Sequence, residues 1–267
     1  MTGHSGAIGI FDSGMGGLTV FARIAERLPE ESVIYLGDTA RVPYGTKSAE
    51  TVLRYARACA DVLLARGIKL LVAACNTASA CAVPALEQSL GVPVIGVIEP
   101  GARAAVQRTR TGHIGVIGTM ATVSSGAYPA AITALMPDAQ VVGQACPLFV
   151  PLAEEGWTEG DVPTLVARRY LEGLRGAGID TLVLGCTHYP LLKSVIGPVI
   201  GQSVALVDSA EETAVTVEEV LTRLGLRAPA GSQARREFLV SDGPENFARV
   251  GKRFLGGDLD CVEWIDF

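Results

Sequence analysis

Two cysteines, Cys75 and Cys186, each follow an apolar run and are themselves followed by small polar residues. The runs are Leu70–Ala74 and Leu182–Gly185. Each pattern predicts a strand, a cysteine at its tip and then a helix, which is where an open α/β sheet carries its chemistry. A lone cysteine in such a run is ordinarily a small buried residue. Two in equivalent positions instead predict a pair of thiol acid/base groups that face one cleft, one for each face of a substrate.

The residues next to the two cysteines bear on their reactivity. A free thiol has a pKa of about 8.5, so a cysteine base needs a helix N-terminus or a nearby cation. The strand–turn–helix pattern places both cysteines at a helix N-terminus. Side chains that can hydrogen-bond follow them directly: Asn76, Thr77, Thr187 and His188. Farther along, Glu154 and Glu155 follow an apolar segment, where a carboxylate either assists His188 or begins a solvated helix.

A glycine-rich loop follows the first apolar run, Ala7–Phe11. It contains Asp12, Ser13 and glycines at 14, 16 and 17, a spacing that matches neither the dinucleotide fingerprint nor a P-loop. Backbone amides that open a helix favour an anion. We therefore expect a carboxylate or an amino acid here, with Asp12 as a partner for an ammonium group or as a base. The alternative is a glycine-rich turn in which Asp12 caps the helix.

A zinc site is an alternative use of the same residues. Cys75, Cys186 and His188 are three possible ligands. Catalytic zinc sites usually contain more histidines or carboxylates, and this chain has only 3 His. We therefore expect no metal. The six cysteines contain no C-x-x-C pair, which argues against a zinc ribbon and against a disulfide framework.

Predicted strands alternate with predicted helices, and such alternation is typical of parallel sheets with right-handed crossovers. The expected strands are Ala7–Phe11, Val33–Gly37, Leu70–Ala74, Val94–Ile98, Ile114–Gly118, Val141–Gly143, Leu182–Gly185, Val204–Val207 and Phe238–Ser241, with another near Val262. The clearest helices are Ser48–Arg66, Val162–Arg175 and Ser209–Leu224.

The series of elements repeats, because three landmarks recur in one order: a first strand with its loop, a strand that ends in a cysteine, and a third strand. We predict an α/β fold of two similar domains with mostly parallel sheets, related by a pseudo-twofold axis, with the active site in the cleft between them. The first domain is expected at 1–98 plus 209–267 and the second at 99–208, with Glu99–Arg103 as the link.

Charge and hydropathy exclude several classes of protein. The net charge is −6 and no basic run stands out, so nucleic acid is not expected as a partner. No apolar stretch approaches the roughly 20 residues of a membrane span. The N-terminus lacks the pattern of a signal peptide. We therefore expect a cytoplasmic protein that does not bind membranes.

Five motifs, in order, resemble those of bacterial glutamate racemases: Phe11–Gly17, Asp38–Gly45, Ala74–Ser79, Gly185–Pro190 and Val207–Ala210. The resemblance extends from about Ala7 to Leu224. It implies an isomerase that interconverts L- and D-glutamate without a cofactor and supplies D-glutamate for peptidoglycan. A homodimer is also expected.

The resemblance also implies roles for individual residues. Cys75 and Cys186 take and return the α-proton on opposite faces of the substrate. The residues expected to contact the amino acid are Asp12, Ser13, Tyr44, Gly45, Asn76, Thr77, Thr187 and His188. Asp12, His188 and Glu154 are the expected supporting acids and bases, with Glu155 as the alternative to Glu154. Thr119 and Thr122 are expected to bind a carboxylate through their hydroxyls.

Three other functions compete with this one. A racemase for aspartate, hydantoins or another amino acid would use the same fold and the same thiols. A two-domain amino-acid-binding protein would need neither thiol. A Cys-His hydrolase needs one cysteine and one base, which would leave the second cysteine without a role.

Overall fold

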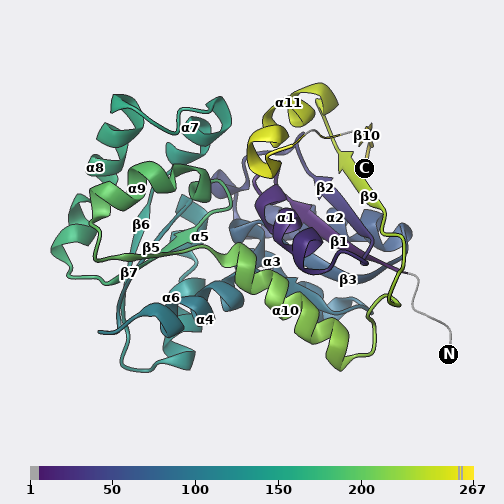
Figure 1. The fold of residues 1–267 in the computed structure, drawn as a ribbon, viewed down its shortest axis with the longest axis horizontal. Coiled ribbons are helices and arrows are strands. Elements are labelled where there is room, and N and C mark those ends of the chain that lie inside the picture. Colours follow the sequence, from purple (N-terminus) through teal and green to yellow (C-terminus); the bar gives the residue numbers. More distant parts are fainter. Residues whose placement is uncertain (1–5, 258, 260) are drawn as a thin grey trace. The chain divides into compact units, whose positions relative to one another are not determined.

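The computed structural model describes residues 6–257, 259 and 261–267 and divides the chain into two compact units. The first unit runs up to Val97 and resumes at Ala210, and the second unit is Ile98–Ser209. Across the described residues, each unit is built on one parallel sheet, of six strands in the first and four in the second. The elements can be followed by their labels in Figure 1.

The first sheet has the strand order β10-β9-β2-β1-β3-β4. Its strands are β1 Ala7–Asp12, β2 Val33–Gly37, β3 Ile68–Ala73, β4 Val94–Gly96, β9 Arg236–Val240 and β10 Val262–Trp264. Its helices are α1 Leu18–Arg27, the 3₁₀ turn η1 Tyr44–Thr46, α2 Ala49–Ala65, α3 Asn76–Ser89, α10 Ser209–Arg223 and α11 Pro244–Leu255. Every residue of β1, β2 and β3 is buried, which explains their nearly continuous apolar sequence.

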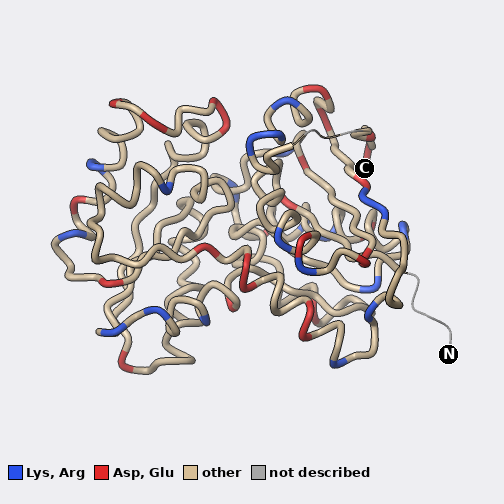
Figure 2. The backbone as a smooth tube through the Cα atoms, in the orientation of Figure 1, with Lys and Arg blue, Asp and Glu red and all other residues tan. Residues whose placement is uncertain are grey.

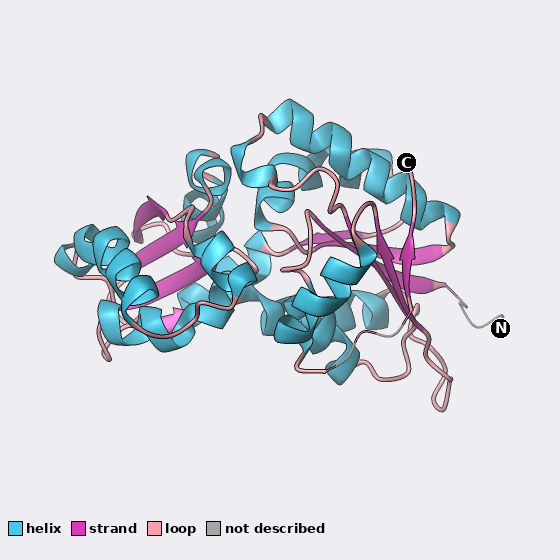
Figure 3. Cartoon of the chain, turned by 90° about the horizontal axis from the view of Figure 1, so that it is seen from above, coloured by secondary structure: helices cyan, strands magenta, loops and turns pink. Residues whose placement is uncertain are grey.

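Helices cover both faces of the first sheet, as Figure 3 shows. Alternate residues of β2 point to opposite faces of the sheet. Ile34 and Leu36 belong to a buried cluster with residues of α2 and α3. Tyr35 points to the other face, where its ring packs against those of Phe238 and Phe247, from β9 and α11. The period of two along a strand thus builds two apolar layers around one sheet.

The second sheet has the strand order β6-β5-β7-β8. Its strands are β5 His113–Gly118, β6 Gln140–Ala145, β7 Thr181–Gly185 and β8 Ala205–Val207. Its helices are α4 Ile98–Arg108, α5 Met120–Ser124, α6 Ala127–Leu135, α7 Phe149–Glu155, α8 Asp161–Gly176, the 3₁₀ turn η2 Tyr189–Leu192 and α9 Lys193–Ile200. One buried cluster joins Leu182 and Leu184 of β7 to residues of α7, α8 and α9.

The two sheets share a common arrangement of four strands. The order β2-β1-β3-β4 in the first unit corresponds to β6-β5-β7-β8 in the second. The first strand of each series is therefore central, and the strand before each cysteine is its neighbour. The sequence repeat pairs the same strands, β1 with β5, β3 with β7 and β4 with β8. Strands β9 and β10 extend only the first sheet, among the residues that the structure describes.

Most predicted elements are found with ends shifted by a few residues. The strand expected at Val94–Ile98 ends at Gly96, and helix α4 begins at Ile98. The expected link, Glu99–Arg103, is therefore helical. Pro100 allows this because a proline in the first turn of a helix loses no hydrogen bond. None of the described helices is both long enough and apolar enough to cross a membrane. Charges of both signs are interspersed along the described chain (Figure 2).

Candidate active site

Cys75 lies where β3 gives way to helix α3. It has an extended backbone conformation and is the N-cap residue of this 14-residue helix. Its side chain is 7% exposed, and its Sγ donates a hydrogen bond of 3.6 Å to Oγ of Ser13. The positive end of the α3 dipole thus points at the sulfur, an arrangement that favours a thiolate. The prediction of a cysteine at a helix N-terminus is confirmed here.

The loop after β1 packs closely against the residues that link β3 to Cys75. Asp12 is completely buried, and its Oδ2 accepts a hydrogen bond of 2.9 Å from the amide of Gly14. A Cβ at Gly17 would lie 2.7 Å from Cβ of Asp12 and 2.8 Å from Cβ of Ala74. Only glycine allows the start of α1 to approach both strand ends this closely. Gly17 therefore serves close packing around Asp12.

Tyr35 is a member of this site that the sequence did not indicate. Its Oη donates a hydrogen bond of 3.1 Å to the carbonyl of Gly14. Burial, and then the negative charge of Asp12, raise the pKa of Tyr35 well above its usual value of 10.0. The phenol therefore stays neutral and holds the Gly14 loop as a donor. In the sequence Tyr35 is one residue of an apolar strand, which gives no sign of this role.

Tyr44 and Gly45 lie in the turn η1 and are buried. Oη of Tyr44 donates a hydrogen bond of 2.5 Å to Oδ2 of Asp38, and burial raises the pKa of Tyr44. Asp38 is completely buried, and its backbone amide donates to the carbonyl of Asp12 at 3.0 Å. The sequence motif that contains Asp38 does not by itself indicate this role. The position of Asp38 does, because it directly follows β2 in the way that Asp12 ends the neighbouring strand β1.

Cys186 follows β7 but is not at the N-terminus of an α-helix, so that expectation is wrong for this residue. The amide of Tyr189 donates to the carbonyl of Cys186 at 3.1 Å, which begins the 3₁₀ turn η2, and helix α9 starts only at Lys193. Pro190 contributes to the difference, because it has no amide hydrogen to donate to Cys186 as the first bond of an α-helix. Cys186 itself is 6% exposed.

His188 connects Cys186 to Glu154. Its Nδ1 lies 3.8 Å from Sγ of Cys186, and its Nε2 lies 3.0 Å from Oε1 of Glu154, near the end of α7. Burial by itself lowers the pKa of His188, but hydrogen bonds to Cys186 and Glu154 outweigh it and raise the pKa to about 10. The imidazole is therefore protonated near neutral pH. Glu155, the sequence alternative, is exposed on the same helix.

The remaining predicted contacts are small polar side chains at the same ends of the strands. Thr119 is the N-cap of α5, and its Oγ1 lies 3.0 Å from Oγ1 of Thr122, whose amide it also accepts at 3.2 Å. Asn76 and Thr77 lie in the first turn of α3 and, like Thr187, are buried. Over the described part of the chain, no three His, Cys, Asp or Glu side chains are grouped so that they could hold a metal ion.

The two units therefore surround their cysteines differently. Cys75 has a helix N-terminus, a hydroxyl and the buried carboxylate loop of Asp12. Cys186 has a protonated histidine backed by a carboxylate. Both environments suit a thiol that gives and takes a proton, since each offers the sulfur a positive dipole or charge.

Comparison with known proteins identifies related sequences and structures. The family model described as Asp/Glu/Hydantoin racemase matches residues 8–217. A glutamate racemase of Geobacter metallireducens is 63% identical over 256 residues, which cover 96% of this chain and 95% of the relative.

Solved structures are similar along nearly the whole chain. Glutamate racemase isoform RacE1 from Bacillus anthracis superposes with a TM-score of 0.94 at 39% identity and covers 98% of each chain. Glutamate racemase from Francisella tularensis, solved in complex with D-glutamate, superposes with a TM-score of 0.92 at 36% identity and also covers 98% of each chain.

Proposed function

We propose that this chain, which belongs to the glutamate racemases of the Asp/Glu/hydantoin racemase family and is an isomerase, uses a two-base mechanism. In this mechanism Cys75 and Cys186 are the two bases that interconvert L- and D-glutamate. Glutamate is supported as the substrate by the Francisella tularensis relative, which was solved with D-glutamate. The product D-glutamate is proposed to supply peptidoglycan synthesis, and the enzyme is proposed to act as a homodimer.

One observation carries the proposed mechanism: a buried thiol follows the equivalent strand in both units. Cys75 follows β3 and Cys186 follows β7, and these strands occupy the same position in the shared four-strand order. A single base tends to return a proton to the face from which it came. Two thiols of similar proton affinity can serve both directions of a racemisation.

The proposed reaction conserves its protons. In one direction a thiolate takes the α-hydrogen of glutamate, the C–H electron pair delocalises into the α-carboxylate, and the second thiol donates its own proton to the opposite face. The first cysteine ends as a thiol and the second as a thiolate. In the reverse direction the two cysteines exchange roles.

The neighbouring residues stabilise the charges of this cycle. The N-terminus of α3 stabilises a thiolate at Cys75. The imidazolium of His188 can donate a hydrogen bond to the sulfur of Cys186, and Glu154 holds the ring from its other nitrogen. Because these two devices differ, we expect kcat and KM each to differ between the two directions. The ratio kcat/KM must still be equal for both directions, because the two enantiomers have the same free energy in solution.

The rest of the site is proposed to bind the charged groups of glutamate. Asp12 has the charge to pair with the ammonium group of the substrate. The hydroxyls of Thr119, Thr122 and Thr187 are neutral donors suited to carboxylates, as are Asn76 and Thr77 in the first turn of α3. Donors aimed at the α-carboxylate also stabilise the negative charge that develops when the α-hydrogen leaves.

The test is a racemase assay on the purified chain with no cofactor added and with a chelator present. Conversion of L- and D-glutamate is followed by circular dichroism, with aspartate as the competing substrate. We expect both enantiomers of glutamate to convert. Cys75→Ala and Cys186→Ala should each lower kcat by about 10²- to 10⁴-fold or more.

Cys81→Ala is the matched control, because Cys81 is a partly buried cysteine farther along α3. It should leave racemisation unchanged. Near-normal racemisation by Cys75→Ala would refute the two-base mechanism. Absence of glutamate racemisation by the wild-type chain, with conversion of aspartate, would refute the proposed substrate.

A further inference from the structure

Six residues near the end of the chain, Val262–Phe267, lie against the loop that contains Tyr44. We call Val262–Phe267 the C-terminal segment and Asp38–Thr46 the Tyr44 loop. The C-terminal segment begins as β10, which pairs with β9 in parallel register, and Ile265 then donates its amide to the carbonyl of Val240 at 2.9 Å. Ile265 and Phe267 pack on the same buried cluster as Tyr44 and Cys75.

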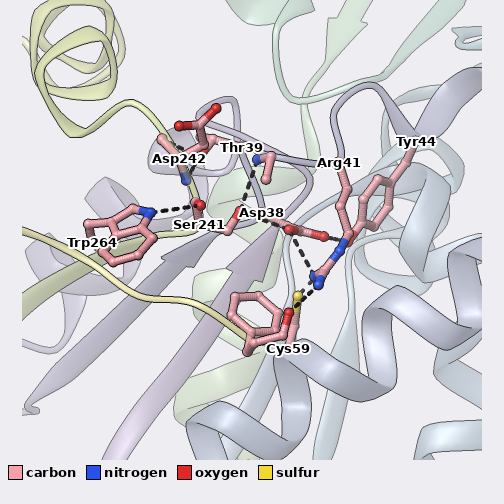
Figure 4. A network of polar contacts seen from close by, with 10 residues as sticks. Asp38, Thr39, Arg41, Tyr44, Cys59, Ser241, Asp242 and Trp264 are labelled. Carbon is pink, nitrogen blue, oxygen red and sulfur yellow. Dashed lines mark hydrogen bonds and ion pairs between the residues drawn. The ribbon is translucent and has the colours of Figure 1, made fainter.

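Arg41 is the direct connection between the two segments. Its guanidinium donates to the backbone oxygen of Phe267, and its Cζ lies 4.6 Å from the centre of the Phe267 ring. The same Cζ lies 5.2 Å from the centre of the Tyr55 ring, in α2. Figure 4 shows Arg41 beside Tyr44 and Asp38. A planar guanidinium can stack on rings and hydrogen-bond at the same time, which a lysine cannot do.

Asp38 transmits this contact to Tyr44. One carboxylate oxygen, Oδ2, accepts from Tyr44 at 2.5 Å. The other, Oδ1, accepts from Arg41 at 3.2 Å and from Oγ of Ser241 at 2.9 Å (Figure 4). Asp38 is completely buried, so these donors take the place of the water that would otherwise hydrogen-bond its carboxylate oxygens. Arg41 and Tyr44 are thus held on the two oxygens of one carboxylate.

The residues that follow β9 attach the Tyr44 loop at further points. Oγ1 of Thr39 donates to the carbonyl of Asp242 at 2.5 Å and accepts its amide at 2.8 Å. The amide of Ala40 donates to Oγ of Ser241 at 2.9 Å. Trp264 in turn donates its indole N–H to the carbonyl of Ser241 at 3.1 Å (Figure 4).

The second unit has no counterpart of this arrangement among its described residues. Strand β6 corresponds to β2 but lies at the edge of its sheet, where the first sheet continues with β9 and β10. The segment after β6 leads into helix α7, which carries Glu154. A helix orders its own backbone, whereas the Tyr44 loop contains only the three-residue turn η1. The loop therefore needs support from outside itself.

We propose that Arg41 is a positioning residue, held by the C-terminal segment, that keeps the Tyr44 loop in the conformation that presents Tyr44 and Gly45 to glutamate. This inference rests on the proposed function, because it takes the loop to be part of the substrate site. Without Arg41 the loop samples other conformations, and the apparent affinity falls in proportion to the fraction that remains competent. Once substrate is bound, the loop has the same conformation, so the chemical step is affected less.

The test measures the loop and the substrate affinity separately. Arg41→Ala and Phe267→Ala should each speed amide hydrogen exchange in a peptide that covers 38–47. They should raise KM for glutamate about tenfold while kcat stays within about threefold. Arg41→Lys keeps the charge but loses the stacking and one hydrogen bond, and should give an intermediate KM.

Arg66→Ala is the matched control. Arg66 also contacts the C-terminal segment, through Glu263 at 2.8 Å. Its ion pairs within the described chain are with Glu263 and Glu237, outside the Tyr44 loop. This variant should leave KM and exchange at 38–47 unchanged. The thermal unfolding midpoint of each variant shows whether a change in KM comes from general unfolding. If Arg41→Ala does not fold, Phe267→Ala still tests whether the C-terminal segment holds the Tyr44 loop.

Two results would overturn the inference. Unchanged exchange at 38–47 in both Arg41→Ala and Phe267→Ala would show that the C-terminal segment does not hold the loop. Faster exchange with an unchanged KM would show that the order of the loop is irrelevant to glutamate. A wild-type chain that does not racemise glutamate would refute the proposed function instead, and the exchange measurement would still report whether Arg41 holds the loop.

Discussion

Glu154 and His188 form an ion pair in which Oε1 lies 3.0 Å from Nε2, while Nδ1 of the same ring lies 3.8 Å from the sulfur of Cys186. The imidazole therefore faces a thiol with one nitrogen and a carboxylate with the other. His188 is 4% exposed, so solvent screens this pair little on the histidine side. A charged histidine fixed in this way is a donor toward the sulfur.

The first prediction separates Glu154 from its neighbour. Glu154→Gln keeps the size of the side chain but removes the charge that favours the imidazolium. We expect kcat to fall about 10- to 100-fold. This is less than the full rate enhancement by a positioned acid/base group, because Glu154 acts through His188. Glu155→Gln, one residue away and exposed, should be indistinguishable from wild type in circular dichroism assays of racemisation. Equal activity of the two variants would show that the Glu154 carboxylate does not act through His188.

The second prediction concerns stability and pH. The folded-state pKa of His188, about 10, lies above its usual value of 6.5. Protonation of His188 therefore stabilises the folded state fully below about pH 6.5, and this contribution is lost as the pH rises through about 10. His188→Asn should lose the contribution at every pH. In urea unfolding, the difference in unfolding free energy between wild type and His188→Asn should narrow from about pH 6 to about pH 10. A constant difference would contradict the raised pKa.

The sequence predicted the strands well because they are apolar and β-branched and are bounded by polar loops. It predicted the position of Cys75 for the same reason. The prediction for Cys186 was half right: the strand before it is present, but the turn η2 follows in place of the expected α-helix. The sequence did not show this, because a proline near the start of a helix is compatible with either an α-helix or a 3₁₀ turn. Arg41 and Tyr35 had no local signal. Their roles depend on partners far away in the chain, Phe267 and Gly14.

The third prediction concerns a buried ion pair between Lys69, in β3, and Glu31. Nζ of Lys69 lies 2.6 Å from Oε2 of Glu31, and the two side chains are 7% and 2% exposed. Lys69→Met leaves a buried carboxylate without its cation and should lower the unfolding free energy by about 3–5 kcal/mol. Adding Glu31→Gln should recover part of this loss, because the amide oxygen can still accept from the amide of Ala228. Urea unfolding of the single and double variants measures both effects. Independent, additive losses would contradict the pairing.

The fourth prediction compares one substitution at two glycines. Gly17→Ala places a methyl group 2.7 Å from Cβ of Asp12 and 2.8 Å from Cβ of Ala74, so the loop after β1 must move away from Cys75. We expect a loss of about 1–3 kcal/mol in unfolding free energy. Because Asp12 is displaced, we also expect a fall in kcat/KM for glutamate that exceeds the loss of folded protein.

Gly173→Ala is the matched control for this substitution. Gly173 is exposed within α8, and a Cβ there meets nothing within 4 Å. The added methyl group should stabilise the helix by about 0.5–1 kcal/mol and leave kcat/KM unchanged. Urea unfolding and racemase assays on both variants separate close packing at Gly17 from the general effect of replacing a glycine. If Gly17→Ala were as active and as stable as wild type, the close approach of the β1 loop to Ala74 would not be needed to place Asp12, and the carboxylate would have to be held by its bond to Gly14 alone.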